Sequence, residues 1–207
     1  MVHRRELNGE EIILGNQGAL WGNAMTWWDH DTGSIWSQPI GEAIAGPLQG
    51  ATLELLPSTL TTWEAWREAN PDTAALDLDG WPTRFYLDNM AIVVDLGTDS
   101  AAYEIPALRD VGVINDVVAG IAVAVVIDPD DEQRWAVFSR TLDEFTVDLE
   151  ITAAGLRDQH TGTVFDPFTG AGREGPLSDQ SLDRLAGFTS FPRDYLNFFP
   201  DGRVWAG

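Results

Sequence analysis

The chain has 207 residues, with 33 acidic side chains against 12 basic ones and a formal net charge of -21. All of the basic residues are Arg, and neither Lys nor Cys occurs. This balance argues against binding to nucleic acid or to an anionic membrane surface, which both require a basic surface. The lack of Cys excludes disulfides, thiolate metal sites and cysteine nucleophiles. A hydrophobic content of 44% predicts a folded globular protein and argues against disorder.

The acidic residues are spread along the whole chain. Such a charge destabilises a small protein by self-repulsion, unless salt shortens the Debye length to roughly 3 Å at about 1 M. The absence of Lys points to the same environment, and we predict a protein of an extreme halophile, a haloarchaeon. The alternatives are an ordinary acidic protein and a calcium-loaded one. The densest acidic run, 128–132, lacks the spacing of a calcium loop and indicates a solvated turn.

In chain order, the first predicted element is a short helix over 63–69. It follows an N-cap at Thr61 or Thr62 and ends before Pro71, because a proline disfavours helical geometry in the residue that precedes it. The second predicted helix runs from about 193 to 199 and ends before Pro200.

Four runs have the length and composition of strands, 90–96, 121–127, 134–140 and 145–151. The run 121–127 is apolar at every position, which predicts a central strand covered on both faces. The run 145–151 alternates, and it is expected to place Phe145, Val147, Leu149 and Ile151 on one face. The predicted fold class is all-β to β-rich α+β, with antiparallel sheets and two short helices.

The sequence contains a diverged tandem repeat with an offset of 129 residues. Residues 31–36 are echoed by 160–165, and Trp66 corresponds to Tyr195. Gly41, 46–48 and 70–72 likewise correspond to Gly170, 175–177 and 199–201. We therefore expect a pseudo-duplicated fold, with a partial first repeat over 1–80 and a complete second repeat over 81–207, packed as one globular body.

The first repeat is expected to be incomplete, because residues 2–7 already resemble 137–142. Three interpretations remain open: a gene start placed too late, a fragment, or strands supplied by a neighbouring molecule. An open sheet edge invites pairing, which predicts a homodimer. The stretch 6–11 is too polar for a signal peptide, and no apolar run is long enough for membrane insertion. The chain as written is expected to be cytoplasmic, and extracytoplasmic if the true start lies upstream.

Two histidines lie in matching turns. His30 is next to Asp29 and Asp31, and His160 follows Asp158 by two positions. A histidine with a carboxylate is a candidate metal-ligand pair, whereas the alternative is an exposed turn whose Asp side chain bonds backbone amides. No second pair of ligands at helical spacing supports a zinc site. No Walker or dinucleotide-binding motif occurs, so no cofactor is predicted.

Six of the nine Trp residues fall in the first repeat: Trp21, Trp27, Trp28, Trp36, Trp63 and Trp66. They are interpreted either as core residues or as the lining of a ligand groove. The groove interpretation selects the candidate ligand-binding residues Asn23, Trp28, Asp29, His30, Trp36 and Gln38. A sugar or an apolar small molecule would suit such a site.

Residues 23–38 and 41–48, followed by 55–63 and 113–120, resemble the family called domain of unknown function 3179. The resemblance covers nearly the whole chain and implies no established activity. Family members occur in bacteria and haloarchaea, and many look exported. Typical members carry a Cys-Pro-Leu-Cys motif after the equivalent of strand 121–127, and often His-Glu before an Asn-Asp pair. This chain has Asp128-Pro129 and Val111-Gly112 at those places, so no metal or redox role built on those groups is expected.

Two functional hypotheses follow. The first is a non-enzymatic binding or structural module with a small-molecule ligand. The second is a metal-binding protein or metal-dependent enzyme that uses His30 and neighbouring carboxylates. The sequence leaves open whether the protein is an enzyme.

Overall fold

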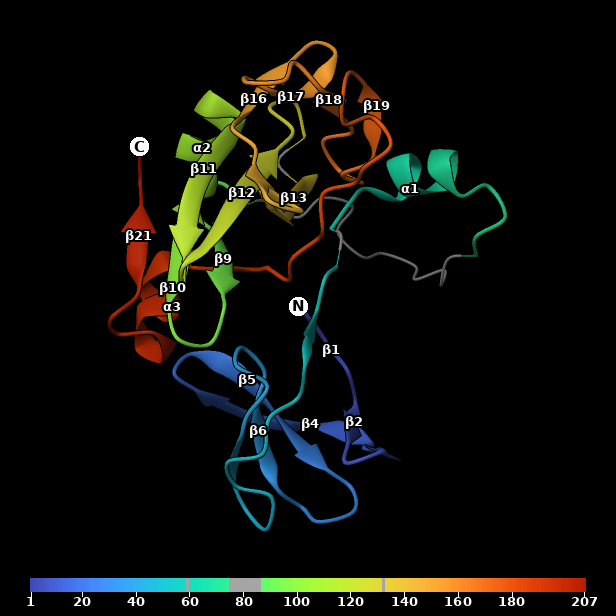
Figure 1. Cartoon of the computed structure of the whole chain (residues 1–207). Coiled ribbons are helices and arrows are strands. Elements are labelled where there is room, and N and C mark those ends of the chain that lie inside the picture. Colours follow the sequence, from blue (N-terminus) through green and yellow to red (C-terminus); the bar gives the residue numbers. More distant parts are fainter. Residues whose placement is uncertain (59, 75–86, 132) are drawn as a thin grey trace.

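The computed structural model describes residues 1–58, 60–74, 87–131 and 133–207. The described chain is rich in antiparallel sheets, which are accompanied by three short helices (Figure 1). The predicted β-rich fold class is therefore confirmed. No helix in these ranges is long and apolar enough to cross a membrane.

The first part of the chain forms three small sheets, drawn in blue and teal at the bottom of Figure 1. Two of them are strand pairs, β1 (Val2–His3) with β8 (Leu55–Leu56) and β2 (Glu6–Leu7) with β3 (Glu10–Glu11). The third is a meander of β4 (Leu14–Trp21), β5 (Ala24–Asp29), β6 (Ile35–Ser37) and β7 (Ala43–Ala45). Its core is a cluster of Ile12, Trp36, Ala43 and Leu53.

The second part of the described chain contains four sheets, shown from green to red in Figure 1. One has the order β20 (Phe188–Ser190), β9 (Ala91–Asp95), β10 (Ser100–Glu104) and β21 (Arg203–Trp205), in which only β10 and β21 are parallel. Another is β11 (Val113–Val118), β12 (Ile121–Ile127) and β13 (Trp135–Ser139). They are followed by the pair β14 (Thr141–Leu142) and β15 (Phe145–Thr146), and by the meander β16 (Leu149–Thr152), β17 (Gly155–Asp158), β18 (Val164–Phe165) and β19 (Gly172–Glu174).

Strand β12 is central, as its apolar sequence predicts. Val123, Val125 and Ile127 pack into one buried cluster with residues of β9 and β10. Ala124 and Val126 belong to a second cluster with residues of β16 to β18. Because alternate residues belong to different clusters, β12 links the two cores of this part. Each large aliphatic side chain buried in this way stabilises the fold by about 1.5–3 kcal/mol relative to exposure.

The helices α1 (Trp63–Ala69) and α3 (Pro192–Phe198) lie close to their predicted positions. A third helix, α2 (Ile105–Val111), was not predicted. Its residues continue the apolar sequence of β10 and show no helical period, and it lacks the proline shortly after its end that marks α3. Pro106 in its first turn and Gly112 at its end, with φ of 73°, are the local signals for its bounds.

The predicted strand 145–151 is interrupted. Val147 N donates to Arg140 O at 2.9 Å, so the chain leaves β15 before β16 begins. The prediction that Phe145 shares one face with Val147 and Leu149 is wrong, since Phe145 is 65% exposed whereas Val147 and Leu149 are buried.

The two four-stranded meanders have the same strand order and matching turns. Asp29 N donates to Ser34 O at 3.0 Å, and Asp158 N donates to Thr163 O at 2.8 Å. Gly46 and Gly175 adopt φ of 97° and 98° at corresponding positions. The sequence repeat thus corresponds to repeated backbone geometry. The boundary between residues 80 and 81 lies outside the described residues, and the division into two units stays a prediction.

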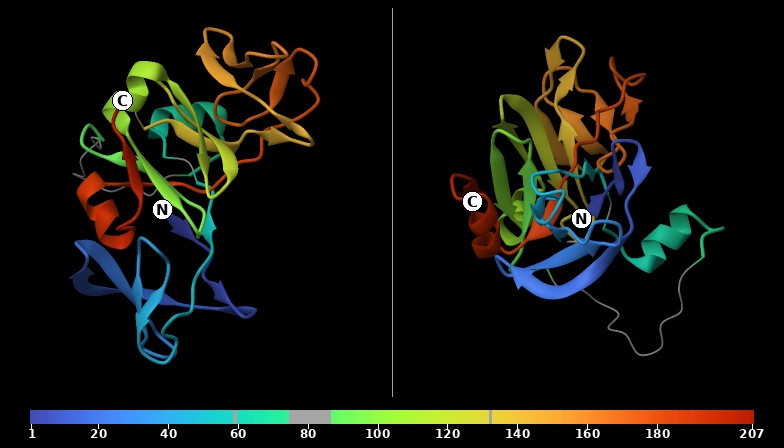
Figure 2. Two further views of the ribbon diagram at one scale, coloured as in Figure 1. Left: turned by 60° about the vertical axis from the view of Figure 1, so that its left-hand side comes forward. Right: turned by 90° about the horizontal axis from the view of Figure 1, so that it is seen from below.

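The β4–β5 hairpin is longer than the β16–β17 hairpin, because Leu14 pairs with Asp29 whereas Leu149 pairs with Asp158. Its tip reaches α3 (Figure 2). There Asn23 Nδ2 donates to Asp194 Oδ1 at 3.1 Å, and the rings of Trp21 and Phe198 meet edge to face, 5.3 Å apart. The tip of the longer β4–β5 hairpin therefore packs against the second part of the chain.

Candidate functional site

Asp29, at the end of β5, is fully buried and holds the turn that follows it. Its carboxylate accepts hydrogen bonds from Thr32 N at 2.6 Å, Thr32 Oγ1 at 2.9 Å, Ser34 N at 3.1 Å and Trp36 Nε1 at 3.0 Å. Burial raises the pKa of Asp29, but these hydrogen bonds outweigh it and hold the pKa below its ordinary value. Both carboxylate oxygens are therefore engaged in the turn.

The matching turn is built in the same way around Asp158, which is also buried. Its carboxylate accepts hydrogen bonds from Thr161 N at 2.8 Å, Thr161 Oγ1 at 2.7 Å and Asp148 N at 2.9 Å. Burial raises the pKa of Asp158, and the hydrogen bonds again outweigh it and lower the pKa. Phe165 stands where the first turn has Trp36. In both turns the Asp side chain accepts hydrogen bonds from backbone amides. This is the arrangement expected if the histidine segments are turns and not metal sites.

His30 and Trp28 form an exposed pair of stacked rings. Their centroids are 4.4 Å apart and their planes are inclined by 12°. The pair lies over Gly15, where a β-carbon would come within 2.7 Å of Trp28 Nε1. The stacked rings form a flat aromatic surface on the first meander. The other candidate residues do not flank it to form a groove.

The six residues of the predicted groove therefore fall into separate places. Trp36 is buried beneath Asp29, and Trp28 stacks on His30. Asn23 lies at the hairpin tip against α3. Gln38 contributes its backbone carbonyl, which accepts a hydrogen bond from His3 Nε2 at 2.8 Å. In the described ranges, no three side chains of His, Asp or Glu are grouped in a way that suits a metal ion.

A cavity of about 310 Å³ lies in the second part, between the β12–β13 loop, the β16–β17 hairpin and the loop that precedes β19. Two arginines and an aromatic ring line it. The Arg134 guanidinium lies 4.0 Å from the centroid of the Phe168 ring, at cation–π distance. Arg134 is also 3.6 Å from Asp128, and Arg173 forms an ion pair with Asp166.

The carboxylates of this cavity are largely engaged. Asp166 Oδ1 accepts hydrogen bonds from Phe168 N at 2.9 Å and Thr169 N at 2.7 Å. Burial raises the pKa of Asp166, but these bonds and the charge of Arg173 lower it below the ordinary value. A guanidinium carries five N–H donors, and one contact with a carboxylate oxygen uses only part of them. The two arginines therefore bring more N–H donors to the cavity than their contacts with Asp128 and Asp166 use.

Sequence reasoning missed this cavity because its lining comes from separate stretches of the chain, the β12–β13 loop, the β16–β17 hairpin, and the loop after β18 together with Arg173. The acidic run 128–132 indicates only a solvated turn by its sequence. No local pattern marks Arg134 and Arg173 as neighbours, and only the tertiary structure brings them to one cavity.

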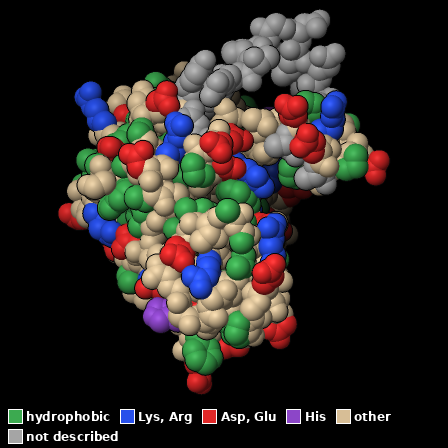
Figure 3. All heavy atoms as spheres, turned by 90° about the horizontal axis from the view of Figure 1, so that it is seen from above, with side chains coloured by type: hydrophobic (Ala, Val, Ile, Leu, Met, Phe, Trp, Pro, Cys, Tyr) green, Lys and Arg blue, Asp and Glu red, His purple; other side chains and the backbone are tan. Residues whose placement is uncertain are grey.

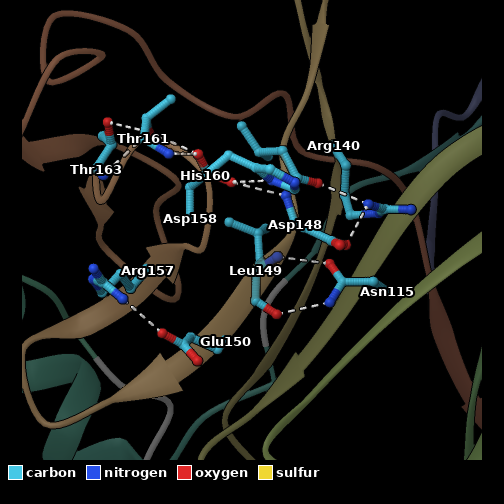
Figure 4. Close-up of polar contacts among 11 residues, drawn as sticks. Asn115, Arg140, Asp148, Leu149, Glu150, Arg157, Asp158, His160, Thr161 and Thr163 are labelled. Carbon is cyan, nitrogen blue, oxygen red and sulfur yellow. Dashed lines mark hydrogen bonds and ion pairs between the residues drawn. The ribbon is translucent and has the colours of Figure 1, made fainter.

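A polar network joins β16 and the turn before it to β11 and β12 (Figure 4). The buried Arg140 donates to Val123 O at 3.0 Å, to Val147 O at 2.7 Å and to Asp148 Oδ1 at 3.2 Å. Asn115 pairs with both backbone groups of Leu149, at 2.7 and 3.0 Å. These bonds satisfy backbone groups at the junction, so the network serves the packing of the sheets.

Tyr103, Asp116 and Arg203 form a second polar group. Tyr103 Oη donates to Asp116 Oδ2 at 2.7 Å, and Arg203 donates to the same oxygen at 2.6 Å. Burial and the Asp116 carboxylate raise the pKa of Tyr103. Burial raises the pKa of Asp116, but the bonds from Arg203 and Tyr103 outweigh it and lower the pKa. Neither group is tuned toward proton transfer at neutral pH.

Comparison with known proteins supports part of the resemblance. Residues 1–89 match the profile of the family described as "Protein of unknown function (DUF3179)". The resemblance is thus confirmed for this stretch, whereas the second resembling block, 113–120, lies outside it. No curated protein and no solved structure matches the chain.

Proposed function

We propose that the protein is a non-enzymatic binding module whose cavity takes a small carboxylate with an aromatic or aliphatic body. The observation that carries this proposal is that Arg134, Arg173 and the ring of Phe168 line the same cavity. Guanidinium groups bind carboxylates through paired N–H donors. The remaining walls include Ile127, Pro129, Ile151 and Pro167, which suit an apolar body.

The balance of donors and acceptors favours an anionic ligand over a cationic one. Asp128 accepts a hydrogen bond from Asp130 N at 3.0 Å and faces Arg134, and Asp166 is engaged by two backbone amides and Arg173. A ligand carboxylate would add an acceptor where donors are in excess. The net charge of -21 opposes the approach of an anion, and molar salt removes this long-range term.

The directions of the pKa shifts support a role without acid–base chemistry. The carboxyl groups with shifted pKa values, Asp29, Asp116, Asp158 and Asp166, are all shifted downward. A carboxyl group is most efficient as a general acid or base when its pKa is raised toward neutral pH, the opposite of the direction found for these four. The alternative of a metal site at His30 gains no support, because its ring stacks on Trp28 and the Asp29 oxygens accept bonds within the turn.

Calorimetric titration with benzoate in molar KCl tests the proposal. Benzoate is expected to bind the full chain at one site, whereas the uncharged benzamide is not. Arg134→Gln and Arg173→Gln are each expected to weaken binding about tenfold or more, because each removes a charge-assisted hydrogen bond.

Arg157→Gln is the matched control, since Arg157 pairs with Glu150 on the surface at 2.9 Å and does not line the cavity. It is expected to bind benzoate as the unchanged chain does. Equal binding of benzoate and benzamide, or equal losses in Arg157→Gln and Arg173→Gln, would contradict the proposal.

A further inference from the structure

Arg184 lies in the segment between β19 and β20, which runs beside β13. Leu185 N donates to Val137 O at 2.9 Å, and Arg184 forms an antiparallel bridge with Phe138. Because paired residues of antiparallel strands point to the same face, the Arg184 side chain lies on the side of Phe138. Phe168 packs against the core cluster of Phe138. Arg184 is therefore placed behind the cavity, and it is not one of the residues that line it.

The guanidinium of Arg184 reaches two backbone carbonyls from distant parts of the chain. Its Nη1 donates to Phe168 O at 3.4 Å, and its Nη2 donates to Ser58 O at 3.2 Å. Ser58 lies between β8 and α1 and precedes Arg184 by 126 positions. The Phe168 carbonyl is thus tied, through one side chain, to the segment that leaves the first part of the chain.

Arg184 carries its charge without a counter-ion among the residues that the structure describes. It is half-buried, and its two contacts in those ranges are both with carbonyls, whereas Arg134 and Arg173 each pair with a carboxylate. Burial lowers the pKa of Arg184 below its ordinary value. Since taking a guanidinium out of water costs free energy that an ion pair usually offsets, this placement indicates a positional role.

The backbone of Phe168 is held on both sides. Its N–H donates to Asp166 Oδ1 at 2.9 Å, and its carbonyl accepts the bond from Arg184. With both groups engaged, the residue has little freedom to turn, so the direction of its ring is set. This ring faces the Arg134 guanidinium, which lies 4.0 Å from the ring centroid.

We propose that Arg184 is a positioning residue of the cavity, an inference that rests on the proposed carboxylate-binding function. By holding the Phe168 carbonyl, Arg184 fixes the ring on which the Arg134 guanidinium lies. It thereby orients the N–H donors that Arg134 offers to a ligand carboxylate. The planar fork of an arginine suits this role, because its two Nη atoms reach two carbonyls at once, whereas a lysine ammonium is a single point.

The Arg134 Nε–H resonance in NMR tests the position of the ring without a ligand. Protons above the face of an aromatic ring are shifted upfield, so this resonance is expected upfield of those of exposed arginines. Its loss in Arg134→Gln assigns it. Arg184→Met keeps most of the aliphatic stem but removes the donors. It should move the resonance toward its position in Phe168→Leu, which lacks the ring.

Calorimetric titration with benzoate in molar KCl measures the consequence for binding. Arg184→Met is expected to weaken binding about threefold to tenfold, as the loss of one hydrogen bond does. Arg184→Lys keeps the charge and one donor nitrogen, so it should restore part of the resonance shift and part of the affinity. Arg157→Met is the matched control, since Arg157 pairs with Glu150 away from the cavity. It should change neither measurement.

The alternative is that Arg184 only fastens Ser58 to the second part of the chain. Thermal unfolding of each variant measures this stabilising role, which by itself would leave the Arg134 resonance of the folded protein unchanged. If Arg184→Met does not fold, Arg184→Lys decides between the two roles, because it retains the charge and one bond.

The two measurements separate this inference from the proposed function. A lack of benzoate binding to the unchanged chain would refute the proposed ligand, and the Arg134 resonance would then decide the role of Arg184 by itself. An Arg134 resonance that neither Arg184→Met nor Arg184→Lys moves would overturn the inference. So would a full return of the shift and the affinity in Arg184→Lys, since the charge alone would then suffice.

Discussion

The indole Nε1 of Trp36 donates a hydrogen bond of 3.0 Å to the buried carboxylate of Asp29. The matching turn has the same carboxylate, Asp158, but carries Phe165 in place of the indole. The two turns therefore provide a natural comparison of one buried carboxylate with and without this donor.

Trp36→Phe is expected to lower the free energy of unfolding by about 1.5–3 kcal/mol, the contribution of a hydrogen bond to a charged group. It should also raise the pKa of Asp29, because Trp36 is a main cause of its low value. Urea unfolding in molar KCl and a carboxyl titration by NMR measure these effects. Trp66→Phe, on an exposed helix position, is the control. An unchanged Asp29 pKa in Trp36→Phe would show that the indole bond is unimportant.

Stability is expected to fall as the pH drops below about 4, the ordinary carboxyl pKa in an unfolded chain. Asp29, Asp116, Asp158 and Asp166 have lowered pKa values in the folded chain. Each therefore binds fewer protons when folded, and its contribution is complete above pH 4 and lost as the pH falls through the folded value.

Acid unfolding should be followed in molar KCl, where relief of charge repulsion on protonation does not mask the effect. Asp158→Asn is expected to lower stability at pH 7 and to flatten its dependence on pH below 4. Asp179→Asn, at an exposed position, should do neither. The same acid slope in both variants would contradict the assignment.

Arg140→Ala is expected to destabilise the protein by about 2–4 kcal/mol. The substitution leaves the buried carbonyls of Val123 and Val147 without their donor, and each unsatisfied group costs about 1–3 kcal/mol. Arg5→Ala, at the corresponding exposed position, should change stability by less than about 0.5 kcal/mol. Chemical denaturation of both variants at one salt concentration measures the difference, and equal effects would refute it.

Gly46→Ala is expected to destabilise the protein more than Gly50→Ala in the same loop. Both glycines have positive φ, 97° and 87°, so both substitutions carry backbone strain. A β-carbon on Gly46 would lie 2.7 Å from Ser34 Cα, whereas one on Gly50 would meet nothing within 4 Å. Overpacking of this kind adds about 1–3 kcal/mol. Thermal unfolding of the two variants compares them, and equal midpoints would contradict the expected clash.

Salt is expected to stabilise the protein strongly. A net charge of -21 repels itself in dilute buffer, and acidic side chains are scattered over the face shown in Figure 3 with arginines among them. The recovery of native protein on refolding should therefore rise steeply from dilute buffer to molar KCl. Full stability without salt would contradict the prediction of a halophilic protein.

Local patterns in the sequence determined the β-rich fold class, strand β12 and the two helices at 63–69 and 193–199. These features depend on residue types close together in the chain, such as the apolar run of 121–127 and the prolines that follow the helices. The repeat also identified the two turns, because Thr-Gly and Gly-Pro pairs constrain the backbone where they stand. Helix α2 was not predicted, because its short apolar sequence shows no helical period. The break before β16 was not predicted either, since it depends on the bond from Val147 N to Arg140 O.

The tertiary structure alone decided which side chains meet. Sequence grouped Trp28, Asp29, His30 and Trp36 into one groove, but strand alternation and the closed turn bury Asp29 with Trp36 and leave Trp28 on the surface with His30. It also brought Arg134, just before β13, and Arg173, in β19, to one cavity beside Phe168. Long-range pairing sets such distances, and spacing along the chain does not encode them.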